Sequence, residues 1–116
     1  MGMEVIFDKS DQLERIQAYV QTGETLYAVY DCKGGGTGFV GITNRRVIFY
    51  DQAFLRKKKS MVSISYKNII GISTADDGVI FKTSEITLLT AAGNFSFEFR
   101  GADKAHDTYK YIMAYL

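Results

Sequence analysis

From Thr25 to Arg100 the sequence shows no helical repeat of apolar residues, and this long helix-free span restricts the possible folds. Short apolar runs follow one another at intervals of about ten residues, separated by turn signals such as Asn44-Arg45. Seven such runs predict a mostly β domain, built as a sandwich or a barrel of antiparallel strands. The predicted strands are Leu26–Cys32, Phe39–Thr43, Arg46–Asp51, Met61–Tyr66, Ile69–Thr74, Ile86–Thr90 and Phe95–Phe99.

Alternation of apolar and polar residues supports two of these strands. Within residues 61–66, Val62, Ile64 and Tyr66 fall on one face and serines fall on the other. Within the last run, phenylalanines are likewise two residues apart. Because successive side chains of a strand point to opposite faces, both runs predict strands with one face in the core and one in water. The inward residues of the last strand are Phe95, Phe97 and Phe99.

A helical repeat precedes the strands in residues 8–21. Leu13, Ile16 and Val20 recur at helical spacing and predict one apolar face. Thr22-Gly23 offers a stop, because glycine adopts the left-handed conformation at a helix end without strain. This segment is therefore predicted as a helical extension, residues 1–21, ahead of the strands. Its candidate N-caps are Asp8, Ser10 and Asp11.

A second helical repeat closes the sequence in residues 103–116, with Asp103 as the candidate N-cap. An amphipathic helix must bury its apolar face, so we expect this helix to lie on the sheet and close one end of it. The predicted buried stripe is Ala105, Tyr109, Ile112, Met113 and Leu116. The predicted solvent side is Lys104, Asp107, Lys110 and Tyr111.

Composition fits one folded domain over residues 1–116. The 116 residues are 47% hydrophobic, include eight Phe and eight Tyr, and carry a net charge of +1, which argues against disorder. The single cysteine, Cys32, excludes a disulfide framework and favours a reducing, cytoplasmic location. The longest uncharged stretch, Ile86–Phe97, is too short and too polar to span a membrane.

Three segments carry a family resemblance. They are Thr22-Gly23-Glu24, the stretch Ile42–Asp51 with its Thr43-Asn44-Arg45-Arg46 hairpin, and Met61–Ile69 with a hydrophobic-x-x-Ile-x-Tyr-x-x-Ile pattern. With these residues the chain resembles the bacterial pleckstrin-homology-like domain family over residues 20–116. The resemblance implies a PH-like barrel: seven antiparallel strands in two nearly orthogonal sheets, a C-terminal helix closing one end, and here an extra N-terminal helix.

Motifs that suggest chemistry have simpler explanations. Gly36-Thr37-Gly38-Phe39-Val40-Gly41 matches a dinucleotide-binding pattern, but a strand and not a helix follows it, so the phosphate-binding geometry is missing. Cys32 lies in an apolar strand, where burial suppresses the thiolate, and one histidine, His106, is too little for an imidazole-based metal site. We therefore expect no catalytic residue, cofactor or metal, and a non-enzymatic binding domain.

The charge layout is uneven along the chain. Residues 1–32 carry a net charge of −4, residues 33–70 carry +7 and residues 71–116 carry −2. Basic residues beside apolar ones suit an anionic membrane surface, which gives an alternative function as a peripheral lipid-binding domain. A solvated hairpin whose lysines discourage aggregation explains the same pattern. The candidate surface-binding residues are Lys33, Phe54, Leu55, Arg56, Lys57, Lys58 and Lys59.

Protein–protein interaction is the leading functional hypothesis. We expect self-assembly into a homo-oligomer, or binding to another protein. The predicted edge strands contain no proline, and Tyr111 and Tyr115 at the margin of the last helix are candidate oligomer contacts. Proteins resembling this family also tend to assemble symmetrically. Nucleic acid is not expected as a partner, because the phenylalanines of residues 95–99 have strict strand spacing and are explained as core.

Overall fold

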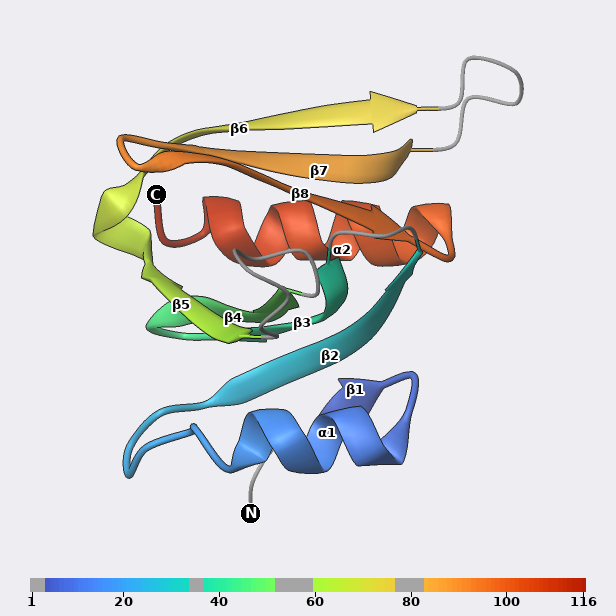
Figure 1. Ribbon diagram of the computed structural model, residues 1–116, viewed down its shortest axis with the longest axis vertical. Helices are drawn as coiled ribbons and strands as arrows, with labels where there is room; N and C mark the ends of the chain where they lie inside the picture. The colour runs from blue at the N-terminus through green and yellow to red at the C-terminus, as the bar shows by residue number, and fades with distance from the viewer. Residues whose placement is uncertain (1–3, 34–36, 52–59, 77–82) are drawn as a thin grey trace.

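Figure 1 shows an antiparallel sheet whose two halves lie on opposite sides of the C-terminal helix α2, with the short helix α1 against the outer surface. This computed structural model describes residues 4–33, 37–51, 60–76 and 83–116, the side chains of residues 76, 83 and 84 excepted. The elements are β1 (Ile6–Phe7), α1 (Ser10–Gln17), β2 (Leu26–Lys33), β3 (Thr37–Thr43), β4 (Arg46–Asp51), β5 (Ser60–Ser65), the 3-10 helix η1 (Tyr66–Asn68), β6 (Ile69–Asp76), β7 (Thr83–Thr90), β8 (Gly93–Phe99) and α2 (Ala102–Met113).

The seven predicted antiparallel strands are confirmed, in the order β5-β4-β3-β2-β8-β7-β6. Strand β2 belongs to both halves, because it pairs with β3 over residues 26–31 and then with β8 at residues 32–33. The two-residue strand β1, which the sequence did not predict, lies parallel to β2. The two expected sheets are thus joined into one, because β2 pairs with β3 along its first part and with β8 at its end.

The core has two parts, one on each face of the β2–β4 half. The larger part lies between the two halves of the sheet and includes Phe49, Phe97 and Ile112. The smaller part lies under α1, where Ile16 packs with Val29 and Ile48. Because both faces of β2, β3 and β4 are covered, nearly every residue of these strands is buried.

Helix α1 packs on its own sheet at a glycine. A Cβ on Gly41 would lie 2.7 Å from Cγ2 of Ile16, so the missing side chain leaves the space that the helix occupies. The helix is shorter than the predicted segment 8–21 and has no side-chain cap. Its candidate cap Asp8 instead accepts hydrogen bonds from the Asp31 N–H at 2.9 Å and from Lys104 Nζ at 2.7 Å.

Helix α2 confirms the predicted closing helix with two corrections. It begins after Gly101, so Asp103 lies in the first turn and does not cap the helix. Its fully buried residues are Ala105, Thr108 and Ile112, so the buried stripe is rotated from the predicted one. Met113 and Leu116, which were predicted to be buried, are 42% and 48% exposed, because Met113 lies off the buried face and Leu116 lies beyond the end of the helix. Tyr111 is wrongly predicted as solvent-facing, since it stacks on Tyr27.

Candidate functional site

Glu24 is the centre of a buried polar cluster that joins the segments carrying the family resemblance. Its carboxylate accepts hydrogen bonds from Arg46 Nε at 2.9 Å, Arg46 Nη2 at 2.8 Å and Thr43 Oγ1 at 2.7 Å. The hydrogen bond from Arg46 is the main cause that lowers the Glu24 pKa to about 2, against the opposing effect of burial. Arg46 also donates to the Tyr19 carbonyl at 2.6 Å, which ties the end of α1 to β4. These motif residues hold the fold together.

Asp31 is the centre of a second polar cluster, which links both helices to β2. Gln12 of α1 donates to Asp31 Oδ1 at 2.7 Å, and Arg100, at the end of β8, donates to Oδ2. Burial favours the neutral carboxyl, but these two hydrogen bonds outweigh it and lower the Asp31 pKa. Asp8 bridges the Asp31 backbone to Lys104 of α2. Both carboxylate oxygens of Asp31 are paired within the chain, so this cluster also stabilises the fold, although Gln12 Oε1 is buried without a partner among the described residues.

The candidate oligomer contacts Tyr111 and Tyr115 contact other tyrosines of the same chain. Tyr111 stacks on Tyr27 with ring centroids 5.2 Å apart, and Tyr115 stacks on Tyr66 at 4.9 Å. The Tyr27 and Tyr115 hydroxyls hydrogen-bond to each other, and Tyr66 donates to the Thr43 carbonyl at 2.6 Å. Tyr115 keeps 40% of its surface exposed. The tyrosines therefore fasten the end of α2 to the sheet, and Tyr115 alone presents substantial surface to a partner.

The two residues considered for catalysis, Cys32 and His106, lie in different environments. Cys32 is buried, and burial is the main cause that raises its thiol pKa to about 12. His106 lines a surface hollow with Ile72, Thr74 and Tyr109. Within the described residues there is no group of three or more His, Cys, Asp and Glu side chains that could hold a metal ion. In the described part of the chain, the Cys32 thiol donates to the Tyr30 carbonyl at 4.0 Å and is not paired with a base.

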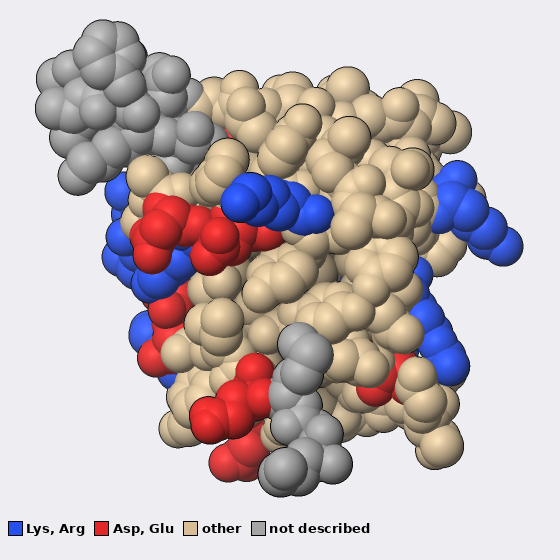
Figure 2. Space-filling view, turned by 180° about the vertical axis from the view of Figure 1, so that it is seen from behind, with Lys and Arg blue, Asp and Glu red and all other residues tan. Residues whose placement is uncertain are grey.

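The candidate lipid-binding residues are only partly described. Phe54, Leu55, Arg56, Lys57, Lys58 and Lys59 lie outside the described residues. Lys33 lies at the end of β2, with its Nζ 3.8 Å from Glu98 Oε2 in an exposed ion pair. Figure 2 shows that basic side chains on one face of the molecule alternate with acidic ones around a broad uncharged area. On that face, the described residues do not form a surface of one sign.

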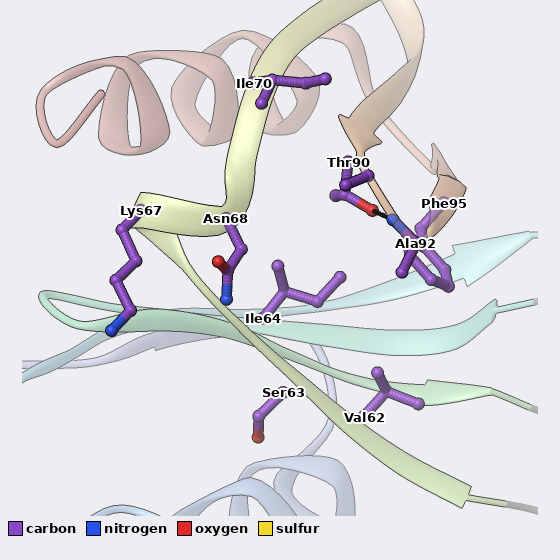
Figure 3. Close-up of a pocket in the computed structure, with 10 residues that line it drawn as sticks. Val62, Ser63, Ile64, Lys67, Asn68, Ile70, Thr90, Ala92 and Phe95 are labelled. Carbon is purple, nitrogen blue, oxygen red and sulfur yellow. Dashed lines mark hydrogen bonds between the residues drawn. The ribbon is translucent and has the colours of Figure 1, made fainter.

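A cleft of about 460 Å³ lies between the two halves of the sheet, where the chain passes from β5 through η1 into β6. Figure 3 shows side chains converging on it from both halves, with Val62 and Ile64 on one side and Ala92 and Phe95 on the other. Ile70 lies at its rim and is 76% exposed, the largest exposed fraction among the large apolar side chains that the structure describes. The full lining is Val62, Ser63, Ile64, Lys67, Asn68, Ile70, Thr90, Ala91, Ala92 and Phe95.

The cleft has a basic end. Lys67 lies at the end away from Phe95 (Figure 3) and also lines a neighbouring hollow with Arg45, Tyr66 and Tyr115. Among the residues that the structure describes, no acidic residue lines either hollow. The sequence predicted the inward positions of Val62, Ile64 and Phe95 but not the cleft, because the cleft depends on how far the two halves diverge. The available signal was Ile70, a large apolar residue followed by residues 71–75, which carry no charge.

Comparison with known proteins agrees with this architecture. The bacterial PH domain family matches residues 11–113. The uncharacterised protein YozO of Bacillus subtilis (strain 168) is 28% identical over 91 residues, covering 78% of this chain and 77% of YozO.

Two solved structures share the fold. A DUF1696 family protein with a pleckstrin-homology domain from Shewanella loihica has a TM-score of 0.67 at 19% identity, covering 99% of this chain and 98% of that chain. A pleckstrin homology domain from Shewanella amazonensis has a TM-score of 0.62 at 23% identity, covering 91% and 99%. The family match runs from α1 to the end of α2, and the strand order and closing helix agree with it. This chain therefore belongs to the bacterial PH domain family.

Proposed function

We propose that this protein is a non-enzymatic binding domain that acts through protein–protein contacts, and that it self-associates through the free edge of β6. Strand β6 pairs only with β7 in the described sheet, so its other edge presents unpaired backbone groups. From Ile69 to Ala75 this edge contains neither a charged residue nor a proline. Natural edge strands usually carry such residues to prevent pairing, so their absence favours pairing with another strand.

The proposal fits the chemistry of the described residues. The buried ionisable groups Glu24 and Asp31 are satisfied by partners in the same chain, as expected for a scaffold and not for a catalytic centre. A single free thiol, Cys32, is compatible with work in a reducing compartment such as the cytoplasm. In the part of the chain that is described, neither helix is long and apolar enough to cross a membrane.

Light scattering tests the self-association directly. Wild-type protein should give a mass above one chain at micromolar concentration, and Ser73→Lys with Ala75→Lys on β6 should lower it towards one chain. Both residues are exposed, so the variant should stay folded. Asn94→Lys, exposed in β8, is the matched control and should leave the mass unchanged. A wild-type mass of one chain, or equal masses for both variants, would overturn the proposal.

Anionic lipid is the second candidate partner, favoured by the net charge of +7 over residues 33–70. The run Arg56-Lys57-Lys58-Lys59 follows Phe54-Leu55, and each basic residue near an anionic surface contributes about 1 kcal/mol. Binding to vesicles containing phosphatidylserine should fall with salt and be lost in Lys57→Glu with Lys58→Glu. Equal sedimentation with neutral and anionic vesicles would exclude this function.

A further inference from the structure

The edge of β5 forms one wall of the cleft between the sheet halves. Val62, Ser63 and Ile64 are consecutive, so Val62 and Ile64 point to one face of the strand and Ser63 to the other, yet all three line the cleft. The Ser63 side chain points away from the cleft (Figure 3), so Ser63 lines the cleft through its backbone at the strand edge. Strand β5 pairs only with β4 in the described sheet, so this edge has unpaired backbone donors and acceptors. The cleft therefore offers hydrogen bonds to another backbone.

Apolar side chains from both halves of the sheet line the cleft, together with the polar residues Asn68 and Thr90. Ile64 is buried, Val62 and Phe95 are half-buried, and Ala91 and Ala92 are exposed at the turn between β7 and β8. Its volume of about 460 Å³ falls within the usual range of ligand sites, about 300–1,000 Å³. Side chains of a strand added beside β5 would point alternately into this apolar space and into water.

The positive charge at one end of the cleft favours a partner with an acidic residue at that position. Lys67 and Arg45 flank the end of β5 and form no ion pair among the described residues, and both adjoining hollows lack acidic side chains. A carboxylate in this position would be matched to both cations. A basic residue would instead meet like charge.

We propose that this cleft binds an extended segment of a different polypeptide, which adds to the free edge of β5. The segment places alternate apolar side chains between Val62, Ile70 and Phe95, and an acidic residue beside Lys67. Main-chain hydrogen bonds to the strand edge supply affinity, while the apolar cleft and the basic end supply specificity. This site goes beyond self-association, because it uses β5 and not β6 and takes a partner of different sequence.

A designed peptide tests the site on the whole protein. The probe is an acetylated hexapeptide that begins with glutamate and continues with alternating valine and threonine. We expect it to shift the backbone amide resonances of residues 61–65 and 91–95 of the labelled wild-type protein. A peptide of the same sequence in which every backbone nitrogen is methylated keeps the side chains but has no N–H donors, so it should not bind.

Two tryptophan substitutions, one inside the cleft and one outside it, test whether the peptide binds in the cleft. Ala92→Trp should fill the apolar space and weaken binding of the probe by at least about tenfold. Asn94→Trp places the same side chain on an exposed residue that does not line the cleft, and binding should be unchanged. Equal affinity in Ala92→Trp and wild type would overturn the proposed location.

Reversal of charge tests the basic end. In wild type the probe should bind about two- to fivefold more tightly than a peptide that begins with lysine, as expected for an exposed charge pair. Lys67→Glu should reverse that preference, whereas a loss of stability alone would weaken both peptides equally. No shift of residues 61–65 by either peptide in wild type would refute the site.

The oligomeric state is measured in the same samples. Peptide binding to a protein whose mass does not change supports the proposal, whether that mass is one chain or several. If the peptide binds only while the oligomer dissociates, a second copy occupies the β5 edge and the proposal is wrong. If wild type has the mass of one chain and still binds the peptide, self-association fails and the peptide site stands.

Discussion

The two halves of the sheet are covered differently. In the half formed by β2, β3 and β4, helix α1 covers the outer face and the main core covers the inner face, so nearly all residues are buried. In the half formed by β6, β7 and β8, α2 and the core cover the inner face, while outer residues such as Ser73 and Ser96 are exposed. The strands of the β2–β4 half therefore have long apolar runs, whereas apolar and polar residues alternate in the strands of the β6–β8 half.

This difference assigns the stabilising contacts and the unpaired edges to different parts of the sheet. The β2–β4 half contains the Glu24–Arg46 ion pair and contacts both parts of the core, and much of its surface is occupied by α1. The β6–β8 half keeps a free edge and, with β5, frames the apolar cleft. Among the described strands, unpaired edges thus remain on β5 and β6 and not in the two-sided region.

Matched outward positions in the two halves provide the strongest test of this comparison. Ile48→Ala, under α1, should lower the free energy of unfolding by about 2–5 kcal/mol, because Ile48 is fully buried and its loss leaves a cavity. Thr87→Ala, on the outer face of β7, should cost less than about 1 kcal/mol, since it removes only the hydrogen bond to Ser96. Urea unfolding measures both, and similar losses would mean that α1 does not cover β4 in solution.

Removal of the buried ion pair should have the next largest effect. Glu24→Ala leaves Arg46 without its carboxylate and should lower the free energy of unfolding by about 2–4 kcal/mol, less than for a fully buried pair because Arg46 is partly exposed. Lys33→Ala, which removes the exposed pair with Glu98, is the control and should change the stability by less than about 1 kcal/mol. Equal effects in denaturant unfolding would contradict the structural role of Glu24.

Acid should destabilise the protein through the same carboxylate. The Glu24 pKa is about 2 when folded and near 4.5 when unfolded, so the unfolded chain takes up the proton first as pH falls. The resulting stability is present above pH 5 and decreases towards pH 2, with about 2 kcal/mol lost by pH 3. Asp31, whose pKa is also lowered, adds a loss in the same direction. Glu24→Gln should flatten the pH dependence of urea midpoints, and an unchanged slope would contradict the assignment.

The smallest expected effect comes from a methyl group at the contact between helix and sheet. Gly41→Ala should cost about 1–3 kcal/mol, because the new Cβ lies 2.7 Å from Ile16 Cγ2. In an Ile16→Ala background the same methyl should cost less, since its clashing partner is gone. A double-mutant cycle measured by urea unfolding reports this coupling, and additive losses would place α1 elsewhere.

Alternation explains which parts of the fold were predictable from sequence. Val62, Ile64 and Tyr66 on one side, and Phe97 and Phe99 on the other, were correctly predicted to point inward because water covers the opposite faces of their strands. The two-sided strands gave correct strand positions but no inward face, since both faces are apolar. The sequence also did not indicate β1, because two residues are too few to show a period.

The candidate sites were less predictable. Tyr111 and Tyr115 were proposed from sequence as oligomer contacts at the margin of the last helix, but their stacking partners Tyr27 and Tyr66 are distant in sequence. Lys67 lies within the family segment Met61–Ile69 and Ile70 directly follows it, yet the sequence does not place either residue opposite the turn that joins β7 to β8. Their role depends on the gap between β5 and the turn that joins β7 to β8.

The order of helix, seven strands and closing helix followed from the sequence alone, because hydrophobic period and turn chemistry are local properties of the chain. The absence of charge and proline from residues 69–75 of β6 is also a local property of the sequence. Tertiary structure decided where α1 docks, which carboxylates are buried beside cations, and where the two sheet halves separate. These features depend on distances between residues far apart in sequence, and such distances are set only when the whole core is packed.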